Sequence, residues 1–252
     1  MADVPDDHPE TPGAASDSAG TPWQRRELSP SGFESDTGEA DPALRALLAA
    51  PGDDLALMRA LEGGRLLVPV VAEPTEVDAT GPLAVEKGVD MAAVTLVAPD
   101  GSRALPVFTG ADSLAAWDAA ARPVPVTPAR AAQAAVSEGC DVLVVDVAGP
   151  ATRVLRPSML WALAQERAWE PAHTDPFVAR AVATALADEP AVAGHEVEEG
   201  APHGAGVLGI VLHLRAGLDA DEVRAVATRV GERLATDGEL RARVDGLAFR
   251  IV

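Results

Sequence analysis

The sequence predicts an α+β protein in which two small domains, each a mixed β-sheet with helices packed on it, follow a disordered acidic tail. Three observations predict this class. Segments with helical and strand periodicity alternate after residue 42. Two apolar runs flank an Asp-Gly turn, the strongest short-range signal of a β-hairpin. The composition also changes sharply at residue 42. Because 252 residues suggest one large or two small domains, we expect domains at residues 43–169 and 175–252.

Residues 1–42 have the composition of a disordered segment. They contain ten acidic and two basic residues, and Pro, Gly, Ser and Thr occupy 18 of the 42 positions. Such a segment cannot bury enough apolar surface to offset the entropy of ordering, about 1–2 kcal/mol per residue. Its one amphipathic island, Pro22–Leu28, is either a solvated part of the tail or a short docking motif that orders on a partner.

The folded part is expected to begin with two short helices and a strand. Asp41-Pro42 is a favourable helix start, because the acidic residue caps the helix and Pro has no N–H to lose there. The helices are predicted at Ala43–Ala50 and Asp53–Leu61. The apolar run Arg65–Ala72 is too short for a buried helix and predicts a strand, with Pro69 on an edge or at a bulge.

A β-hairpin is the clearest unit of the sequence. The runs Met91–Ala98 and Arg103–Thr109 flank the turn that contains Asp100-Gly101. Thr109 and Asp112 stand three residues apart and predict a capping box for a short helix. The rest of the first domain is expected to form a strand, a helix, two strands and a helix: Arg122–Val126, Pro128–Ser137, Asp141–Val147, Thr152–Leu155 and Met159–Ala168.

The second domain is predicted to follow a linker at Glu170–Thr174 and to have the order α-β-β-α-β. Alternating apolar residues in its second strand indicate that the strand is half-buried. Asp219 and Glu222 predict a capping box at the start of a long helix. The expected elements are Pro176–Ala187, Ala191–Val197, Val207–Arg215, Asp219–Leu234 and Leu247–Val252.

The charge and composition exclude several classes of protein. The net charge of −19 disfavours a general binder of nucleic acid or of anionic membranes, because both need a cationic surface. No apolar run approaches the roughly 20 residues that span a bilayer, and the acidic N-terminus does not resemble a secretory signal. A single Cys excludes an intramolecular disulfide. We therefore expect a soluble cytoplasmic protein.

Reactive groups are scarce in this sequence. The thiol of Cys140 lies between Glu138 and Asp141, whose negative charges suppress the thiolate. No phosphate-binding glycine loop, nucleophile elbow or EF-hand motif occurs. His195, His203 and His213 could form a three-histidine metal site if the acidic loop after His195 folds back, but their spacing matches no recognised pattern. We expect no cofactor, and the inventory favours a protein that is not an enzyme.

The tryptophans are the most informative large side chains. Trp161 and Trp169 lie two helical turns apart and would share one face if their helix persists. Together with Trp117 they either pack in the core or seal the two domains against each other, or they form an exposed patch that captures a protein, rimmed by Arg156 and Arg167. The candidate interaction surface is therefore Trp117, Trp161, Trp169 and Arg167.

The middle of the chain resembles a known family. The segments LLVPV (Leu66–Val70), VTLVAPDGSRALPVFTG (Val94–Gly110), LAAW (Leu114–Trp117) and LVVD (Leu143–Asp146) resemble the N-terminal domain of the SseB family of bacterial proteins, over about residues 55–168. Residues 175–252 are more weakly similar to the second domain of longer members. The family name refers to enhanced serine sensitivity. The resemblance implies a fold but no reaction, cofactor or catalytic residue.

Three functions remain open on these grounds. The first is a non-catalytic interaction or regulatory module of the SseB type, which binds a protein partner or a second copy of itself. The second is a sensor of an amino acid or another small molecule, with its pocket between the two domains. The third is a metal-dependent enzyme that uses His195, His203 and His213.

Overall fold

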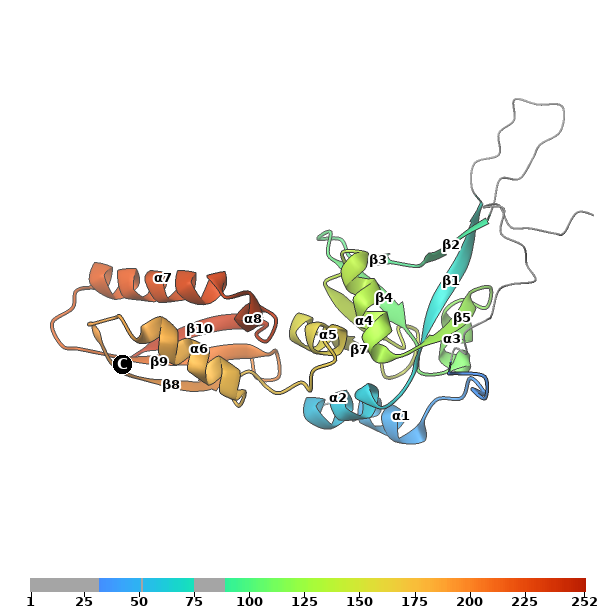
Figure 1. The fold of residues 1–252 in the computed structure, drawn as a ribbon, viewed down its shortest axis with the longest axis horizontal. Coiled ribbons are helices and arrows are strands. Elements are labelled where there is room, and N and C mark those ends of the chain that lie inside the picture. Colours follow the sequence, from blue (N-terminus) through green and yellow to red (C-terminus); the bar gives the residue numbers. More distant parts are fainter. Residues whose placement is uncertain (1–31, 51, 75–88) are drawn as a thin grey trace, which may run out of the picture. The chain divides into compact units, whose positions relative to one another are not determined.

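The computed structural model describes residues 32–50, 52–74 and 89–252 (Figure 1). Residues Gly38 to Val252 form one compact unit, and the residues up to Thr37 are a separate unit. Most of the predicted tail, with Pro22–Leu28, lies outside the described residues. The α+β class is confirmed by helices and three separate sheets. The domain limits 43–169 and 175–252 stay predictions.

The first two helices form where the sequence predicts them. In α1 (Pro42–Ala49) the side chain of Asp41 accepts a hydrogen bond of 2.7 Å from the N–H of Ala43. In α2 (Asp54–Glu62) the side chain of Asp53 accepts one from the N–H of residue 56. Both caps satisfy a backbone N–H that has no partner within its helix.

The first sheet shows that the prediction for Pro69 is wrong. β1 (Leu66–Pro74) is the middle strand of an antiparallel sheet, between β2 (Val89–Ala93) and β5 (Arg122–Val126). Pro69 is tolerated there because the pairing with β2 begins only at the next residue. No ladder bond therefore requires an N–H at position 69, which is the condition that Pro needs within a sheet.

The second sheet has the strand order β3-β4-β6-β7. The predicted hairpin is confirmed, since β3 pairs antiparallel with β4 and Leu96 lies opposite Ala104. The run Met91–Ala98, however, is not one strand: β2 pairs with β1, whereas β3 belongs to the second sheet. Leu67 and Phe108 exchange two backbone hydrogen bonds that join the two sheets. The strands are β3 (Leu96–Val97), β4 (Arg103–Val107), β6 (Val142–Val145) and β7 (Arg153–Leu155).

The capping box predicted at Thr109 does not form. Gly110 is the N-cap of α3 (Ala111–Trp117), and no side chain caps this helix. Thr109 is buried and donates two hydrogen bonds to Asp146, from its N–H at 2.9 Å and from its hydroxyl at 2.7 Å. The carboxylate of Asp146 is also buried and needs these donors. A contact between residues 37 positions apart has replaced the local cap.

Two further helices complete the larger hydrophobic core. α4 (Pro128–Ser137) matches its prediction and is capped by Thr127. α5 (Pro157–Ala164) is shorter than predicted, because the chain leaves the helix after Ala164 and Glu166 has a φ of +52°. Buried side chains of both helices pack with those of α1, α2, β1, β4 and β6 in one cluster. Leu67, Phe108 and Leu114 belong to a smaller cluster.

The C-terminal elements form a separate hydrophobic cluster around the third sheet. β9 is the middle strand, antiparallel to β8 and parallel to β10. α6 and α7 lie beside this sheet (Figure 1). Their apolar side chains pack against Leu208, Ile210 and Leu212, on one face of β9. The capping box of Asp219 and Glu222 is confirmed. The elements are α6 (Pro176–Leu186), β8 (Val192–Glu199), β9 (Val207–Leu214), α7 (Ala220–Thr236), the unpredicted α8 (Gly238–Arg241) and β10 (Gly246–Ile251).

Among the described residues, no helix has both the length and the apolar character that a membrane-spanning segment requires.

Glu189 connects the loop after α6 to α7. Its buried carboxylate accepts hydrogen bonds from Arg229 at 2.8 and 3.1 Å and pairs with Arg233 at 2.9 Å. The hydrogen bond from Arg229 outweighs the effect of burial and holds the pKa of Glu189 below its ordinary value of 4.5. The ion pairs therefore stabilise the charged carboxylate in the folded state.

We expect Glu189→Gln to lower the free energy of unfolding by about 1–3 kcal/mol at about pH 7, because the two arginines lose their anion. The pKa of Glu189 is lower in the folded than in the unfolded protein. Its ion pairs therefore stabilise the fold fully above about pH 4.5, and this stabilisation is lost as the pH falls through the lower pKa of the folded state. Urea denaturation over this range measures the difference between the two proteins, which should shrink in acid. The exposed Glu232→Gln is the control, and an equal loss of stability in the control would contradict the assignment.

Candidate functional site

Arg156 is the centre of a network of ion pairs. It precedes Pro157 as the N-cap of α5, but its side chain does not cap that helix. Its Nη1 lies 2.8 Å from Asp54, the first residue of α2, and its Nε lies 3.0 Å from Asp245, which directly precedes β10. Arg153 pairs with the other oxygen of Asp54 at 2.8 Å. One guanidinium thus joins two carboxylates that are 191 positions apart in the sequence.

Asp245 has further partners on α5. Its carboxylate accepts hydrogen bonds from the N–H of Ser158 at 2.7 Å and from the Ser158 hydroxyl at 2.8 Å. The indole Nε1 of Trp169 donates to the Ser158 hydroxyl oxygen at 3.1 Å, and the Arg156 guanidinium lies 5.8 Å from the centre of the Trp169 ring. We call this set the Arg156 network: Asp54, Arg153, Arg156, Ser158, Trp169 and Asp245.

Glycine at position 206 leaves room for the network. Gly206 has a φ of +74°, a backbone conformation that residues other than glycine rarely adopt. A Cβ on this residue would lie 2.9 Å from Nε of Arg156 and would overlap the Asp245 carboxylate. The loop between β8 and β9 can therefore approach the ion pair only with glycine here. The neighbouring carbonyl of Gly204 accepts a hydrogen bond of 2.9 Å from Arg156.

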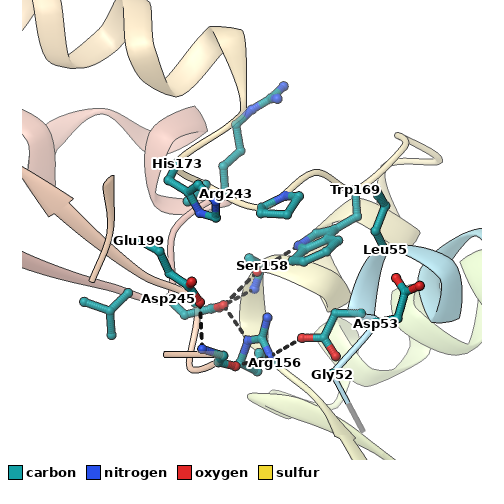
Figure 2. Close-up of a pocket in the computed structure, with 16 residues that line it drawn as sticks. Gly52, Asp53, Leu55, Arg156, Ser158, Trp169, His173, Glu199, Arg243 and Asp245 are labelled. Atoms are coloured by element: carbon teal, nitrogen blue, oxygen red, sulfur yellow. Dashed lines mark hydrogen bonds and ion pairs between the residues drawn. The ribbon is translucent and has the colours of Figure 1, made fainter. Parts of the chain in front are cut away.

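All members of the network except Arg153 line a pocket of about 230 Å³, which we call the network pocket (Figure 2). Glu199 lines the same pocket and accepts a hydrogen bond of 2.8 Å from the N–H of Gly204. This hydrogen bond is the main cause that holds the pKa of Glu199 below its ordinary value, and the interaction with His203 contributes a smaller part. The lining residues are Gly52, Asp53, Asp54, Leu55, Arg156, Ser158, Trp169, Pro171, Ala172, His173, Glu199, Gly204, Gly206, Val207, Arg243 and Asp245.

Arg243 belongs to the pocket lining but is held by other partners. It pairs with Asp175 at 2.7 Å and with Glu239 at 2.6 Å, and it lies 4.5 Å from the centre of the Phe177 ring. Burial by itself would lower the pKa of Arg243, but the two carboxylates outweigh it and raise that pKa. Its guanidinium is therefore committed to the start of α6 and to α8.

The polar groups of the Arg156 network satisfy one another. Each carboxylate faces a guanidinium, and the Ser158 hydroxyl both donates and accepts. A buried charge that is paired and hydrogen-bonded is stable, whereas removing one partner leaves the other uncompensated. The arrangement suits a fixed connection between α2, α5 and the segment before β10.

The four residues of the candidate interaction surface lie in different surroundings. Trp169 is buried in the Arg156 network, and Trp117 lies in the small cluster with its ring 5.5 Å from that of Phe108. Trp161 is exposed on α5. Because α5 ends at Ala164, the condition for Trp161 and Trp169 to share a helical face is not met.

Arg167, the fourth of these residues, is half-buried. It donates to the carbonyl oxygen of Ala168 at 3.2 Å, and its Nη2 is buried without a hydrogen-bond partner in the described part of the chain. Burial lowers the pKa of Arg167, and the positive charge of Arg243 adds to this effect.

The three histidines do not converge. His195 pairs with Leu212 in the sheet register, so its side chain lies on the opposite face from that of His213. His213 and His203 each lie 3.3 Å from a glutamate, Glu196 and Glu199 respectively. No group of three or more His, Cys, Asp and Glu side chains suited to a metal ion occurs within the described residues.

Cys140 is buried at the entrance to β6. Burial is the main cause that raises the pKa of its thiol, and the negative charges of Glu138 and Asp141 act in the same direction. The sequence predicts the direction of this shift from the two charges but not its main cause.

The sequence did not identify the Arg156 network. The sequence indicates Arg156 only as a rim residue of the tryptophan patch, and Asp54, Ser158 and Asp245 give no signal of their own. Two weak local hints exist: an Arg-Pro-Ser helix start, and an Asp-Gly pair directly before the last strand. Neither specifies its partner, because the contacts cross 87 to 102 positions of sequence.

We expect Gly206→Ala to lower the free energy of unfolding by about 3–5 kcal/mol, because the added methyl group must separate a buried ion pair. Gly204→Ala is the matched control. Gly204 also has a positive φ, +77°, but a Cβ there would meet no atom within 4 Å, so it should cost only about 1–2 kcal/mol of backbone strain. Urea denaturation of both variants checks the difference, and equal losses would contradict the close approach at Gly206.

Residues 41–162 match the family model described as the SseB protein N-terminal domain. The match does not include residues 175–252, so the weaker likeness of that segment to a second family domain stays a prediction. Neither the comparison with curated proteins nor that with solved structures finds a match.

Proposed function

Because the chain belongs to the SseB family by its residues 41–162, we propose that it is a non-catalytic interaction module of the SseB type, which binds a protein through the edges of its β-sheets. One observation carries this proposal. Among the described residues, the exposed large apolar side chains lie on or next to edge strands, with Trp161 the one exception. They are Val97 on β3, Val124 on β5, Val154 on β7, Leu247 and Ile251 on β10, and Val252 beside it.

Sheet edges combine two properties that favour protein binding. Their outer backbone N–H and C=O groups have no partner in the sheet, and an added strand can satisfy them. Apolar side chains beside them gain free energy when the partner covers them. Val97, which is 67 % exposed, and Val154, which is 52 % exposed, lie on the two opposite edges of one sheet. Each of these two short edges can accept a short extended segment.

The Arg156 network contributes to this function by fixing the binding surface. β7 leads directly into α5, and Arg153 at the start of β7 pairs with Asp54. Asp245 directly precedes β10 and is bound to Arg156 and Ser158. Edges that are rigid before binding lose less conformational entropy in the complex, so more of the contact energy appears as affinity.

A photo-crosslinking residue at Val97 or at Val154 tests this proposal in the cells that make the protein. We expect discrete protein adducts from both positions after irradiation, because the partner strand lies against these side chains. The exposed residue Ala225 on α7 is the control position and should give none. The absence of adducts at both edge positions, or the same adducts at Ala225, would contradict the proposal.

A small-molecule sensor is the second candidate, and the network pocket is the observation that supports it. Its volume of about 230 Å³ is below the roughly 300–1,000 Å³ of drug-sized ligand sites, so it suits a ligand as small as an amino acid. Its lining carries both carboxylates and guanidinium groups. A zwitterion could be recognised by both kinds of charge.

A thermal-shift panel of amino acids tests this second candidate. A ligand present at 100 times its Kd should stabilise the protein by about 2.7 kcal/mol. Glu199 lines the pocket outside the Arg156 network, so Glu199→Ala should weaken this shift and should lower the stability without ligand only by the loss of its hydrogen bond with Gly204. A panel without any shift, or a shift that Glu199→Ala leaves intact, would contradict ligand binding in this pocket.

A further inference from the structure

The edge strands differ in how well they can accept another strand. β3 and β7 contain two and three residues, which limits the number of backbone hydrogen bonds that either can offer. β8 carries a dense set of acidic side chains, Glu196, Glu198 and Glu199, and charge on an edge strand opposes pairing. β5 and β10 are longer than β3 and β7 and carry no acidic residue.

Proline blocks the outer edge of β5. The backbone N–H and C=O of Leu67 in β1 bond to Phe108, so they point away from β5. In an antiparallel ladder the direction alternates, so the backbone groups of the residues directly before and after Leu67 point toward β5. Leu67 lies opposite Pro125, and position 69 lies opposite Pro123. The two residues of β5 whose backbone faces outward are therefore both proline, and neither has an N–H to donate.

β10 has an open outer edge. Val252, just after the strand, donates its N–H to the carbonyl of Leu212 at 3.0 Å and accepts from the N–H of Leu214 at 3.1 Å. The backbone N–H and C=O of Val252 therefore point toward β9. In a parallel ladder the backbone groups of every second residue point toward the partner strand in this way. The alternate residues Leu247, Phe249 and Ile251 consequently turn their N–H and C=O groups outward. The described residues place one strand, β9, beside β10.

The side chains on this edge are arranged symmetrically. Leu247 is 38 % exposed and Ile251 is 39 % exposed, and they stand two positions before and two positions after Phe249. All three lie on the sheet face that α6 and α7 cover, because they pair with Leu208, Ile210 and Leu212 in register. A strand of the same sequence running antiparallel, with its own Phe249 opposite this one, would place its Ile251 against Leu247.

We propose that the occupant of this edge is a second copy of the chain, paired antiparallel through β10 with a two-fold axis at Phe249. Three residue pairs would each exchange two backbone hydrogen bonds, about six in all. Leu247 of each copy would cover Ile251 of the other. This inference rests on the proposed function, because it names the edge and the partner for one interaction of that kind.

No unpaired charge on β10 opposes pairing with a second copy at this edge. Arg250 is the one charged residue of β10, and it is already paired with Glu198 at 3.0 Å on the opposite sheet face. The outer edge of β10 thus has no unpaired charge that would attract a charged segment. Two whole chains of −19 repel one another, so salt should strengthen the dimer by screening that repulsion. A basic partner peptide would show the opposite dependence.

Sedimentation equilibrium of the full chain is the first test. We expect a reversible dimer with a Kd in about the micromolar range, because one strand pair buries less than the roughly 1,200–2,000 Å² of a standard interface. Ile251→Lys should raise this Kd at least about tenfold. Ala225→Lys places the same charge on the exposed surface of α7 and should leave the Kd unchanged. A monomeric wild type at high salt, or equal effects of both variants, would overturn the proposal.

Cysteine pairs test the register independently of affinity. Residues that exchange hydrogen bonds in an antiparallel pair have Cα atoms about 5.5 Å apart, a distance that a disulfide can span. The double variant Leu247→Cys with Ile251→Cys should therefore form a disulfide-linked dimer under mild oxidation. Neither single variant should form this dimer, because in this register the cysteine of one copy and the cysteine of the other lie four positions apart along the paired strands. Crosslinking by both single variants, or none by the double variant, would overturn the two-fold pairing.

The two proposals fail separately. A chain that stays monomeric but gives adducts at Val97 and Val154 overturns the β10 dimer and leaves the interaction module standing. A β10 dimer without adducts at those positions leaves self-association as its one supported interaction and contradicts binding at the other edges.

Discussion

The salt bridge between Arg156 and Asp245 is the interaction on which the rest of the structure depends. Two hydrophobic clusters form from different parts of the chain, one from α1 to α5 and one from α6 to β10. Arg156 connects α5 to α2 through Asp54 and to the segment before β10 through Asp245. The buried carboxylate of Asp245 tolerates no substitute without a cost, because Arg156 would keep its charge, and both Arg156 and Ser158 would lose their acceptor. The loop at Gly206 is shaped to allow this contact.

Local features of the fold were predictable because local physics determines them. Asp41, Asp53, Thr127 and Asp219 cap the helices that they precede, since a side-chain oxygen satisfies an N–H within three residues. The hairpin at Asp100-Gly101 and the family resemblance of the middle of the chain could likewise be recognised from residues that are close in sequence. The predictions that failed were those in which a distant residue competed. Thr109 binds Asp146 instead of capping α3, and Pro69 lies inside a sheet because its neighbour strand starts one residue later.

The candidate site was not predictable for the same reason. Apart from Trp169, each member of the Arg156 network is an ordinary surface residue by its type, and only the fold brings α2, α5 and the start of β10 together. The tryptophans were the strongest signals available, yet their size says nothing of where a helix ends. The end of α5 at Ala164 separates exposed Trp161 from buried Trp169. The strand edges were likewise hidden, because a sequence does not state which strand lies last in a sheet.

We propose that this protein acts through exposed strand edges and that β10 is the edge that pairs with a second copy. Amide hydrogen exchange, resolved at single residues, tests this claim directly at low and high protein concentration. The N–H groups of Leu247, Phe249 and Ile251 should exchange rapidly in dilute solution and become protected at high concentration. The N–H groups of Ala248 and Arg250, which face β9, should be protected in both. Equal exchange of all five amides at every concentration would contradict the claim.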